Sequence, residues 1–107
     1  MSKWFSMAGR RALVTGASMS IGRSIALGFA DHGASVAVHY SAAADAAIGM
    51  ADAAQATLDD VRARGVDGCL VEADLEAEGE MHGVVSVFWK SREPTEGEIF
   101  EIGEGDD

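Results

Sequence analysis

Several residue types are scarce in this chain of 107 residues, which is long enough for one domain at most. Cys69 is the only cysteine, so an intramolecular disulfide is excluded and a reducing compartment is expected. The sequence has eight basic and eighteen acidic residues, and the resulting net charge of −10 argues against binding to nucleic acid or an anionic membrane. No stretch approaches the ~20 apolar residues of a membrane-spanning helix. The first residues do not resemble a signal peptide, so a cytoplasmic protein is expected.

The acids are concentrated at the carboxyl end. Residues 91–107 hold seven acids and one base and therefore carry −6 of the formal charge. Their one short apolar cluster, Ile99, Phe100 and Ile102, lies in an acidic, glycine-containing context that is typical of disordered chain. We expect residues 1–90 to form the domain and residues 91–107 to form an acidic, disordered tail. A short edge strand at 98–102 is the alternative.

Apolar runs and alanine-rich segments alternate along the rest of the chain. The runs at 11–15, 35–40 and 68–73 are typical of buried strands. Helical spacing is found at 20–32, 44–64 and 76–90, and the middle helix would bury Ile48, Ala51, Ala54, Leu58 and Val61. Alternation of this kind predicts an α/β fold, a partial Rossmann-like, doubly wound parallel sheet of three strands. Right-handed crossover helices give these strands the local order 3-2-1.

The sequence TGASMSIG, residues 15–22, joins the first expected strand to the first expected helix. Gly16 would make a tight turn, and Gly22 would let the helix pack closely. A helix start offers unpaired N–H groups and a partial positive charge, which suit a pyrophosphate. Ser18 and Ser20 add hydroxyl donors. The loop therefore predicts a phosphate site at the carboxyl edge of the sheet, where ligands of such folds bind.

This spacing resembles the T-G-x-x-x-G-I-G loop of the short-chain dehydrogenase/reductase family, with Ser20 in place of the middle glycine. GRRALVTGAS resembles the first strand of the family, IALGFADHGASVAVHY its first helix and second strand, and VEADL its third strand. The resemblance covers residues 9–90 and is strongest to 3-oxoacyl-carrier-protein reductases. In the family, the Asp-aliphatic pair at Asp74 and Leu75 contacts adenine. The cofactor-binding residues that the resemblance implies are Gly16, Ser18, Met19, Ser20, Ile21, Gly22, Tyr40, Ser41, Asp74 and Leu75.

The identity of the dinucleotide stays open between NADP and NAD, with a slight preference for NADP. Members of the family that prefer NAD carry an acid at the end of the second strand. Tyr40 stands there in this chain, followed by Ser41, so no carboxylate would repel a 2′-phosphate. However, Met19 replaces the arginine that many NADP users carry. Arg23, one helical turn along, is expected to face solvent.

Ser20 stands where the family has a glycine. Serine is favoured at a helix N-cap, and Gly33 suits the C′ position of the same helix. If residue 20 instead needs a positive φ, a side chain costs about 1 kcal/mol or more. Otherwise the consequence of the serine is crowding of the ligand. Binding is expected to be weak, because only the adenosine and pyrophosphate side of the site is present.

The residues that perform the chemistry of the family are missing from this sequence. Its members use a Tyr-x-x-x-Lys pair, in which the lysine lowers the pKa of the tyrosine. Here Tyr40 is the only tyrosine, Ala44 stands four residues on, and no asparagine is present for the Asn-Asn-Ala-Gly segment. The resemblance ends near Ser91. We expect the N-terminal NAD(P)-binding part of an oxidoreductase, truncated and not catalytically competent alone. A non-catalytic dinucleotide-binding module, or an interaction protein that completes its sheet with another chain, is the alternative.

Other polar residues do not form a recognisable site. His32, His39 and His82 lack metal-ligand spacing, and each is expected at a helix end or on the surface. Asp59 and Asp60 are expected on a solvated helix face. Cys69, within a strand, is expected to be a buried, unreactive thiol.

The first strand is expected to be an open edge of the sheet. Ala12, Leu13 and Val14 would present unpaired N–H and C=O groups, to which other chains can pair. Only the apolar cluster of the tail would be available to cover them. The isolated chain is therefore expected to aggregate, to form a dimer through this edge or to be partly unfolded.

Overall fold

The computed structural model describes residues 6–75 and 99–101 of the chain. In order, this part contains β1 (Arg11–Val14), α1 (Ser20–Asp31), β2 (Ser35–Tyr40), α2 (Ala42–Ala47), α3 (Ala53–Arg62), β3 (Gly68–Glu72) and β4 (Ile99–Glu101). The helix expected at 76–90 lies outside the described residues, as do His82 and Ile102.

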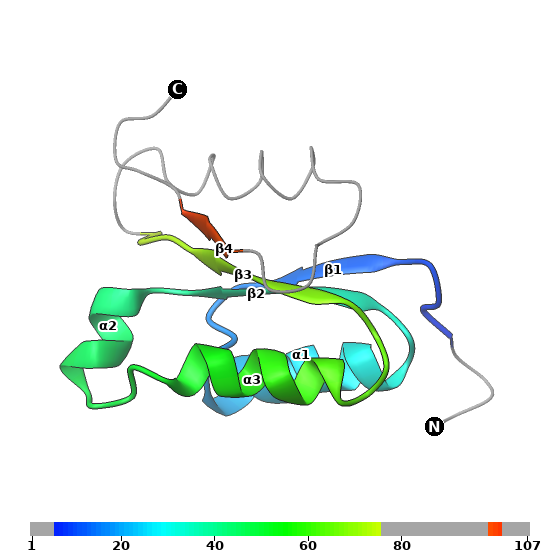
Figure 1. Cartoon of the computed structure of the whole chain (residues 1–107), viewed down its shortest axis with the longest axis horizontal. Helices are drawn as coiled ribbons and strands as arrows, with labels where there is room; N and C mark the ends of the chain where they lie inside the picture. Colours follow the sequence, from blue (N-terminus) through cyan, green and yellow to red (C-terminus); the bar gives the residue numbers. More distant parts are fainter. Residues whose placement is uncertain (1–5, 76–98, 102–107) are drawn as a thin grey trace.

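The described strands form one parallel sheet in the order β1-β2-β3-β4 (Figure 1). Arg11 lies opposite Ser35, and Val38 lies between Val14 and Leu70. The predicted α/β class and the local strand order 3-2-1 are therefore confirmed. In parallel sheets the carboxyl ends of neighbouring strands meet at one edge, so the segments after β1, β2 and β3 come together.

The strand β4 comes from the acidic segment, where disordered chain was the first expectation. Residues Ile99–Glu101 pair with Leu70–Glu72 of β3, in agreement with the alternative of a short edge strand. The three-stranded sheet thus gains a fourth strand beside β3. Because β4 lies at that edge, it does not cover β1. The division of the chain at residue 90 stays a prediction.

Strand β1 is the outer strand at the opposite edge of the described sheet. The amide of Ser35 donates to the carbonyl of Arg10 over 3.0 Å, so Arg10 faces β2. Backbone groups of successive strand residues point alternately to opposite sides, so Ala12 and Val14 also face β2. The expectation that all three residues from Ala12 to Val14 have unpaired backbone groups is therefore too broad. Leu13 is the one whose groups face the open edge.

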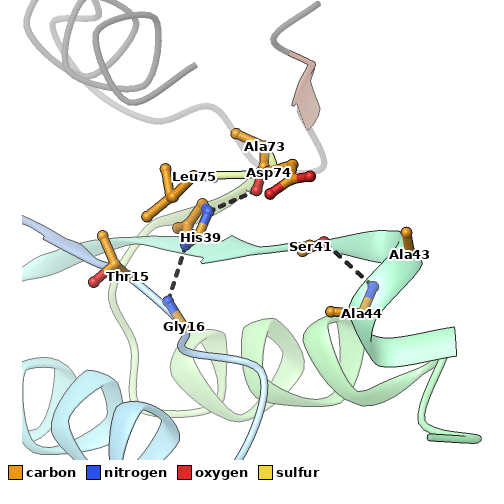
Figure 2. A pocket seen from close by; sticks show the side chains of 9 residues that line it. All are labelled: Thr15, Gly16, His39, Ser41, Ala43, Ala44, Ala73, Asp74 and Leu75. Atoms are coloured by element: carbon orange, nitrogen blue, oxygen red, sulfur yellow. Dashed lines mark hydrogen bonds between the residues drawn. The ribbon is translucent and has the colours of Figure 1, made fainter. Parts of the chain in front are cut away.

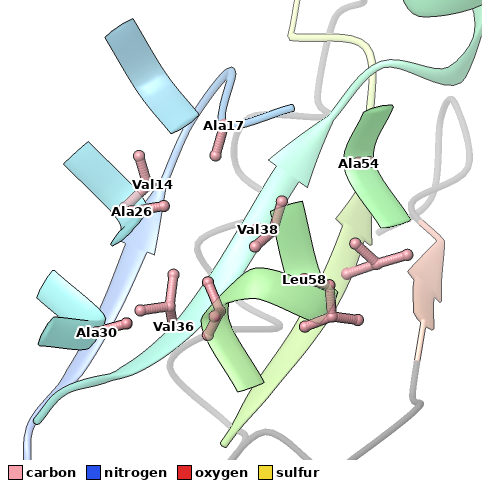
Figure 3. Close-up of a cluster of buried hydrophobic side chains, with 10 residues drawn as sticks. Val14, Ala17, Ala26, Ala30, Val36, Val38, Ala54 and Leu58 are labelled. Carbon is pink, nitrogen blue, oxygen red and sulfur yellow. The ribbon is translucent and has the colours of Figure 1, made fainter. Parts of the chain in front are cut away.

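Helices α1 and α3 lie side by side against one face of the sheet (Figure 1). Their apolar sides and the strands enclose a core in which small residues let the layers approach (Figure 3). A Cβ at Gly68 would lie 2.8 Å from Cδ1 of Leu58, so this glycine lets α3 approach β3 closely. The buried members of the core are Val14, Ala17, Ala26, Ala30, Val36, Val38, Ala54, Leu58, Val61 and Leu70.

A second apolar cluster contains Ala37, Cys69, Val71 and Ala73, all of which are buried. Ala37 and Cys69 are register partners on β2 and β3. Cys69 has 2% of its surface exposed, which confirms the predicted buried cysteine. Burial away from water suits an unreactive thiol.

The single helix predicted for 44–64 is wrong, because two helices, α2 and α3, occupy this segment. Gly49 adopts a φ of +75°, and the amide of Met50 donates to the carbonyl of Asp45 over 2.8 Å, which ends α2. Ile48 and Ala51 fall in the break and are exposed rather than buried. Ala54, Leu58 and Val61 are buried as expected. High helix propensity of alanine did not prevent the turn, since glycine at position 49 permits the left-handed backbone.

Candidate functional site

A cavity of about 460 Å³ lies at the carboxyl ends of β1, β2 and β3 (Figure 2). Pockets for small ligands commonly have volumes of about 300–1,000 Å³. The walls come from residues 15–22, called the glycine loop below, from the start of α2 and from the segment after β3. The residues that line it are Thr15, Gly16, His39, Ser41, Ala43, Ala44, Ala73, Asp74 and Leu75.

Two glycines shape the loop that borders this cavity. Gly16 turns the chain after β1 with a φ of +62°, in the left-handed region. A Cβ at Gly22 would lie 2.0 Å from the carbonyl oxygen of Gly16, so the first turn of α1 packs directly on the loop backbone. The predicted turn at Gly16 is thus present. The close approach predicted for Gly22 is made to the loop itself.

Ser20 does not cap α1, contrary to the sequence-based expectation. Met19 is the N-cap residue, without a side-chain hydrogen bond to the helix, and the first turn has no acidic residue. Ser20 has a φ of +56° and is the one non-glycine residue with a positive φ in the described part of the chain. The loop therefore needs a left-handed residue at position 20, at a cost of about 1 kcal/mol for serine. The free N–H groups at the helix start have no side-chain acceptor from the N-cap.

Ser18 is buried, with 5% of its surface exposed, and does not line the cavity. Its hydroxyl donates to Oδ1 of Asp45 on α2 over 3.2 Å, and its carbonyl accepts from the hydroxyl of Thr57 on α3 over 3.0 Å. The single hydroxyl hydrogen is therefore already used. Asp45 is itself buried, and its Oδ2 has no hydrogen-bond partner within the described residues.

Arg23 is directed toward α3, whereas the sequence predicted a solvent-facing side chain. It forms an ion pair with Asp60 and donates to Oγ1 of Thr57 over 3.2 Å. About a third of its side-chain surface is exposed. The described lining of the cavity contains no lysine or arginine.

His39 is buried, with 4% of its surface exposed, so its expected place on the surface is wrong. The amide of Gly16 donates to Nδ1 over 2.9 Å, and Nε2 lies 2.9 Å from the carbonyl oxygen of Ala73 (Figure 2). His32, in contrast, is the C-cap of α1, a helix end as predicted. Gly33 follows with a φ of +99°, which confirms the predicted glycine at the end of this helix.

The cavity brings together four of the ten predicted cofactor-binding residues. These are Gly16, Ser41, Asp74 and Leu75. Ser41 also accepts from the amide of Ala44 over 3.3 Å and thereby caps α2. Asp74 is exposed and Leu75 is partly buried.

The other six predicted residues lie outside the lining of the cavity. Met19, Ser20, Ile21 and Gly22 form the start of α1, where the side chain of Ile21 is 77% exposed. The ring of Tyr40 packs against the main core. The hydrogen bonds of the His39 ring connect two of the loops at the cavity. The lining residues that the sequence did not predict are Thr15, His39, Ala43, Ala44 and Ala73.

The described residues contain no group of three or more His, Cys, Asp or Glu side chains placed to hold a metal ion. None of their helices has the length and apolar character to cross a membrane.

Comparison with curated proteins gives relatives of one kind. No protein-family model matches the chain. It is 38% identical over 76 residues to 3-oxoacyl-[acyl-carrier-protein] reductase FabG of Staphylococcus aureus, which corresponds to 71% of this chain and 28% of that protein. It is 39% identical over 77 residues to 1-cyclohexenylcarbonyl-CoA reductase of Streptomyces collinus, covering 72% of this chain and 24% of that enzyme. The chain thus spans about a quarter of the length of these relatives.

Solved structures give the same result. A short-chain dehydrogenase of Burkholderia cenocepacia in complex with NADP has a TM-score of 0.68 at 31% identity, covering 80% of this chain and 32% of that one. The angucycline C-6 ketoreductase LanV with bound NADP has a TM-score of 0.62 at 36% identity, covering 80% of this chain and 29% of that one. With the parallel sheet and glycine loop described above, these likenesses show that the matched part of the chain is similar in sequence and fold to members of the short-chain dehydrogenase/reductase family.

Proposed function

We propose that the chain binds a nicotinamide dinucleotide through its adenosine and pyrophosphate groups. The observation that carries the proposal is the cavity beside Gly16 at the carboxyl ends of three parallel strands. Dinucleotides bind at this edge in doubly wound folds. The two solved neighbours named above were determined with NADP.

The adenine would lie between Asp74 and Leu75, which line the cavity beside Gly16. The adenosine ribose would lie toward Ser41 at the end of β2. The pyrophosphate would lie against the first N–H groups of α1, which receive no side-chain cap from Met19. A helix N-terminus stabilises such a group through its free N–H donors and its dipole. Chemistry that the whole family performs on the nicotinamide would come from residues beyond this site.

Binding to NADP and to NAD are both part of the proposal, with a slight preference for NADP. Strand β2 ends at Tyr40 and Ser41 follows it, so no carboxylate stands at this position of the chain to repel a 2′-phosphate. Met19 and the ion-paired Arg23 supply no free cation for a 2′-phosphate, so the preference is small. Affinity is expected to be weak, with a Kd above about 1 µM, because the described residues are expected to contact only the adenosine and pyrophosphate side of the ligand.

We do not assign hydride transfer to these 107 residues alone. Tyr40, the only tyrosine of the sequence, has Ala44 rather than lysine four residues on. A general acid or base of matched pKa is required for carbonyl reduction in this family. The purified chain should therefore not oxidise NADPH with carbonyl substrates above the blank rate. A rate that follows protein concentration and disappears in a Gly22→Ala variant would contradict this.

Self-association through β1 is a second proposal, and it rests on the position of Leu13. Its backbone groups face the open edge of the described sheet, since β4 pairs with β3 instead. Unpaired edges are sites where another chain can add a strand. Light scattering should show a species larger than the monomer, in which the Leu13 amide exchanges slowly. A monomer in which that amide is nevertheless protected would contradict the proposal.

Calorimetric titration with NADP and NAD tests the main proposal. Saturable binding with a Kd above about 1 µM is expected, weaker than about −8 kcal/mol. A Kd below 1 µM would contradict the expected weakness. Absence of heat with both dinucleotides up to millimolar concentration, for a chain that circular dichroism shows to be folded, would contradict the binding function itself.

A further inference from the structure

His39 lies at the point where the carboxyl ends of β1, β2 and β3 are joined. Its ring contacts Gly16 after β1 and Ala73 after β3, with both nitrogen-to-partner distances at 2.9 Å. Its carbonyl also accepts from the amide of Ala17 over 2.8 Å. The amide of Ala73 donates to the carbonyl of Tyr40 over 3.0 Å. The side chain thus completes a set of hydrogen bonds that crosses β2 from one loop to the other.

The two partners of the ring determine which nitrogen carries hydrogen. A backbone N–H can only donate, so Nδ1 must accept from Gly16. A carbonyl oxygen can only accept, so Nε2 must donate its hydrogen to Ala73. This arrangement is satisfied by the neutral imidazole with hydrogen on Nε2 alone. Both nitrogens are then occupied, which leaves the ring no free position for a metal ion or for proton transfer.

The bond to Gly16 acts on the residue that shapes the loop. Gly16 turns the chain with a φ of +62° between β1 and the segment that leads into α1. Its amide is directed at the imidazole rather than into the cavity, although Gly16 and His39 both line that cavity (Figure 2). Gly16 is exposed and its bond to the ring is partly buried, so without the ring its amide would bond to water and the turn would lose the contact that fixes it.

We propose that His39 is a positioning residue for the dinucleotide: by accepting from Gly16 its ring keeps the turn at Gly16, and with it the cavity, formed before the ligand arrives, while the bond to Ala73 orients the ring. The inference rests on the proposed binding function. A preformed site avoids the cost of ordering the loop during binding. The ring acts through the two loops and takes no part in the chemistry of the ligand.

Nuclear magnetic resonance of the full chain tests the hydrogen-bond arrangement without any ligand. Long-range 1H–15N spectra should show His39 as the neutral Nε2–H tautomer at pH 7.5, and the Gly16 amide should exchange slowly with solvent. Detection of the Nδ1–H tautomer, of a charged ring or of a rapidly exchanging Gly16 amide would overturn the proposal.

Two variants separate the two bonds of the ring. In His39→Asn the carboxamide oxygen lies near the former Nδ1 and can still accept from Gly16. In His39→Gln the longer amide reaches toward Ala73 and leaves Gly16 without its acceptor. We expect His39→Asn to bind NADP within about threefold of the original affinity and His39→Gln to bind about tenfold more weakly or worse. Unchanged affinity in His39→Gln, or an equal loss in both variants, would overturn the proposal.

The outcomes distinguish this inference from the proposed function. If the unaltered chain binds neither dinucleotide, the proposed function fails and the ligand-positioning role fails with it, whatever the tautomer. If it binds and the variants do not differ as expected, only the role of His39 fails. Should His39→Gln not fold, as judged by circular dichroism, the tautomer and the His39→Asn affinity still decide the matter.

Discussion

The two halves of the glycine loop are built differently. The first half, Gly16 to Ser18, donates hydrogen bonds to His39 on β2 and Asp45 on α2 and accepts one from Thr57 on α3. The second half, Met19 to Gly22, has no side-chain cap. It also contains the left-handed Ser20. The protein thus fixes the loop from the strand side and leaves free donors at the helix side. A loop of this kind is already formed before a ligand binds. Its unpaired N–H groups lie at the helix start, where a phosphate would bind.

Gly22→Ala should have the largest effect, because it disrupts the packing between the two halves. The added Cβ would meet the Gly16 carbonyl oxygen at 2.0 Å, so the helix start must move away from the loop. We expect a loss of about 1–3 kcal/mol in the free energy of unfolding and loss of measurable NADP binding. Urea unfolding and calorimetry measure these changes.

Gly28→Ala is the matched control in the same helix. A Cβ at Gly28 meets no atom within 4 Å, so it should leave binding unchanged. The change should raise stability by up to about 1 kcal/mol, since alanine is the better helix former. Equal behaviour of the two variants would show that close packing at Gly22 does not shape the loop.

Thr57→Val tests the support of the first half of the loop. Thr57 is fully buried, donates to the Ser18 carbonyl and accepts from Arg23. Its removal takes the side-chain donor away from the Ser18 carbonyl, while Arg23 keeps its ion pair with Asp60, and we expect a loss of about 1–3 kcal/mol in the free energy of unfolding with weaker NADP binding. Thr57→Ser keeps the hydroxyl and should lose less. A serine variant as unstable as the valine variant would assign the effect to the lost methyl group.

Ser20→Gly should have the smallest effect, and a favourable one. Glycine adopts the φ of +56° found here without the steric penalty of a side chain. We expect the free energy of unfolding to rise by about 0.5–1 kcal/mol, and NADP affinity to rise by up to about fivefold through reduced crowding. Ser20→Ala is the control, because it removes the hydroxyl and keeps the strain. Weaker binding by both variants would identify the serine hydroxyl as a phosphate ligand.

The strands of the sheet could be predicted because each of them is marked by a short run of neighbouring apolar residues. Short apolar runs at 11–15, 35–40 and 68–73 have the length of strands and alternate with longer helical segments, and the crossover helices set the order of the strands. The break between α2 and α3 was missed because the many alanines of the segment outweighed the cost of about 1 kcal/mol that one glycine, Gly49, imposes on a helix. The placement of β4 beside β3 depends on pairing between residues far apart in the chain.

The glycine loop was predictable in kind but not in its bonds. The spacing of Gly16, Gly22 and Gly33 along the chain predicts a turn, a close approach and a helix end, and the structure shows each of them at these positions. Ser18 and Asp45 lie 27 residues apart, and no pattern joins them. His39 stands alone in an apolar strand, and its partner Ala73 is 34 residues away. The partners of buried polar groups are set by packing and are not visible in a linear pattern.

Titration of the 15N-labelled chain with NADP, followed through its amide resonances, tests the central claim most directly. The account predicts saturable shifts at Gly16, Ser41 and Asp74 and at the start of α1, with a Kd above about 1 µM, while the turn at Gly65 on α3's far end stays unchanged. Shifts confined to residues remote from the cavity, or none at millimolar NADP and NAD, would contradict it.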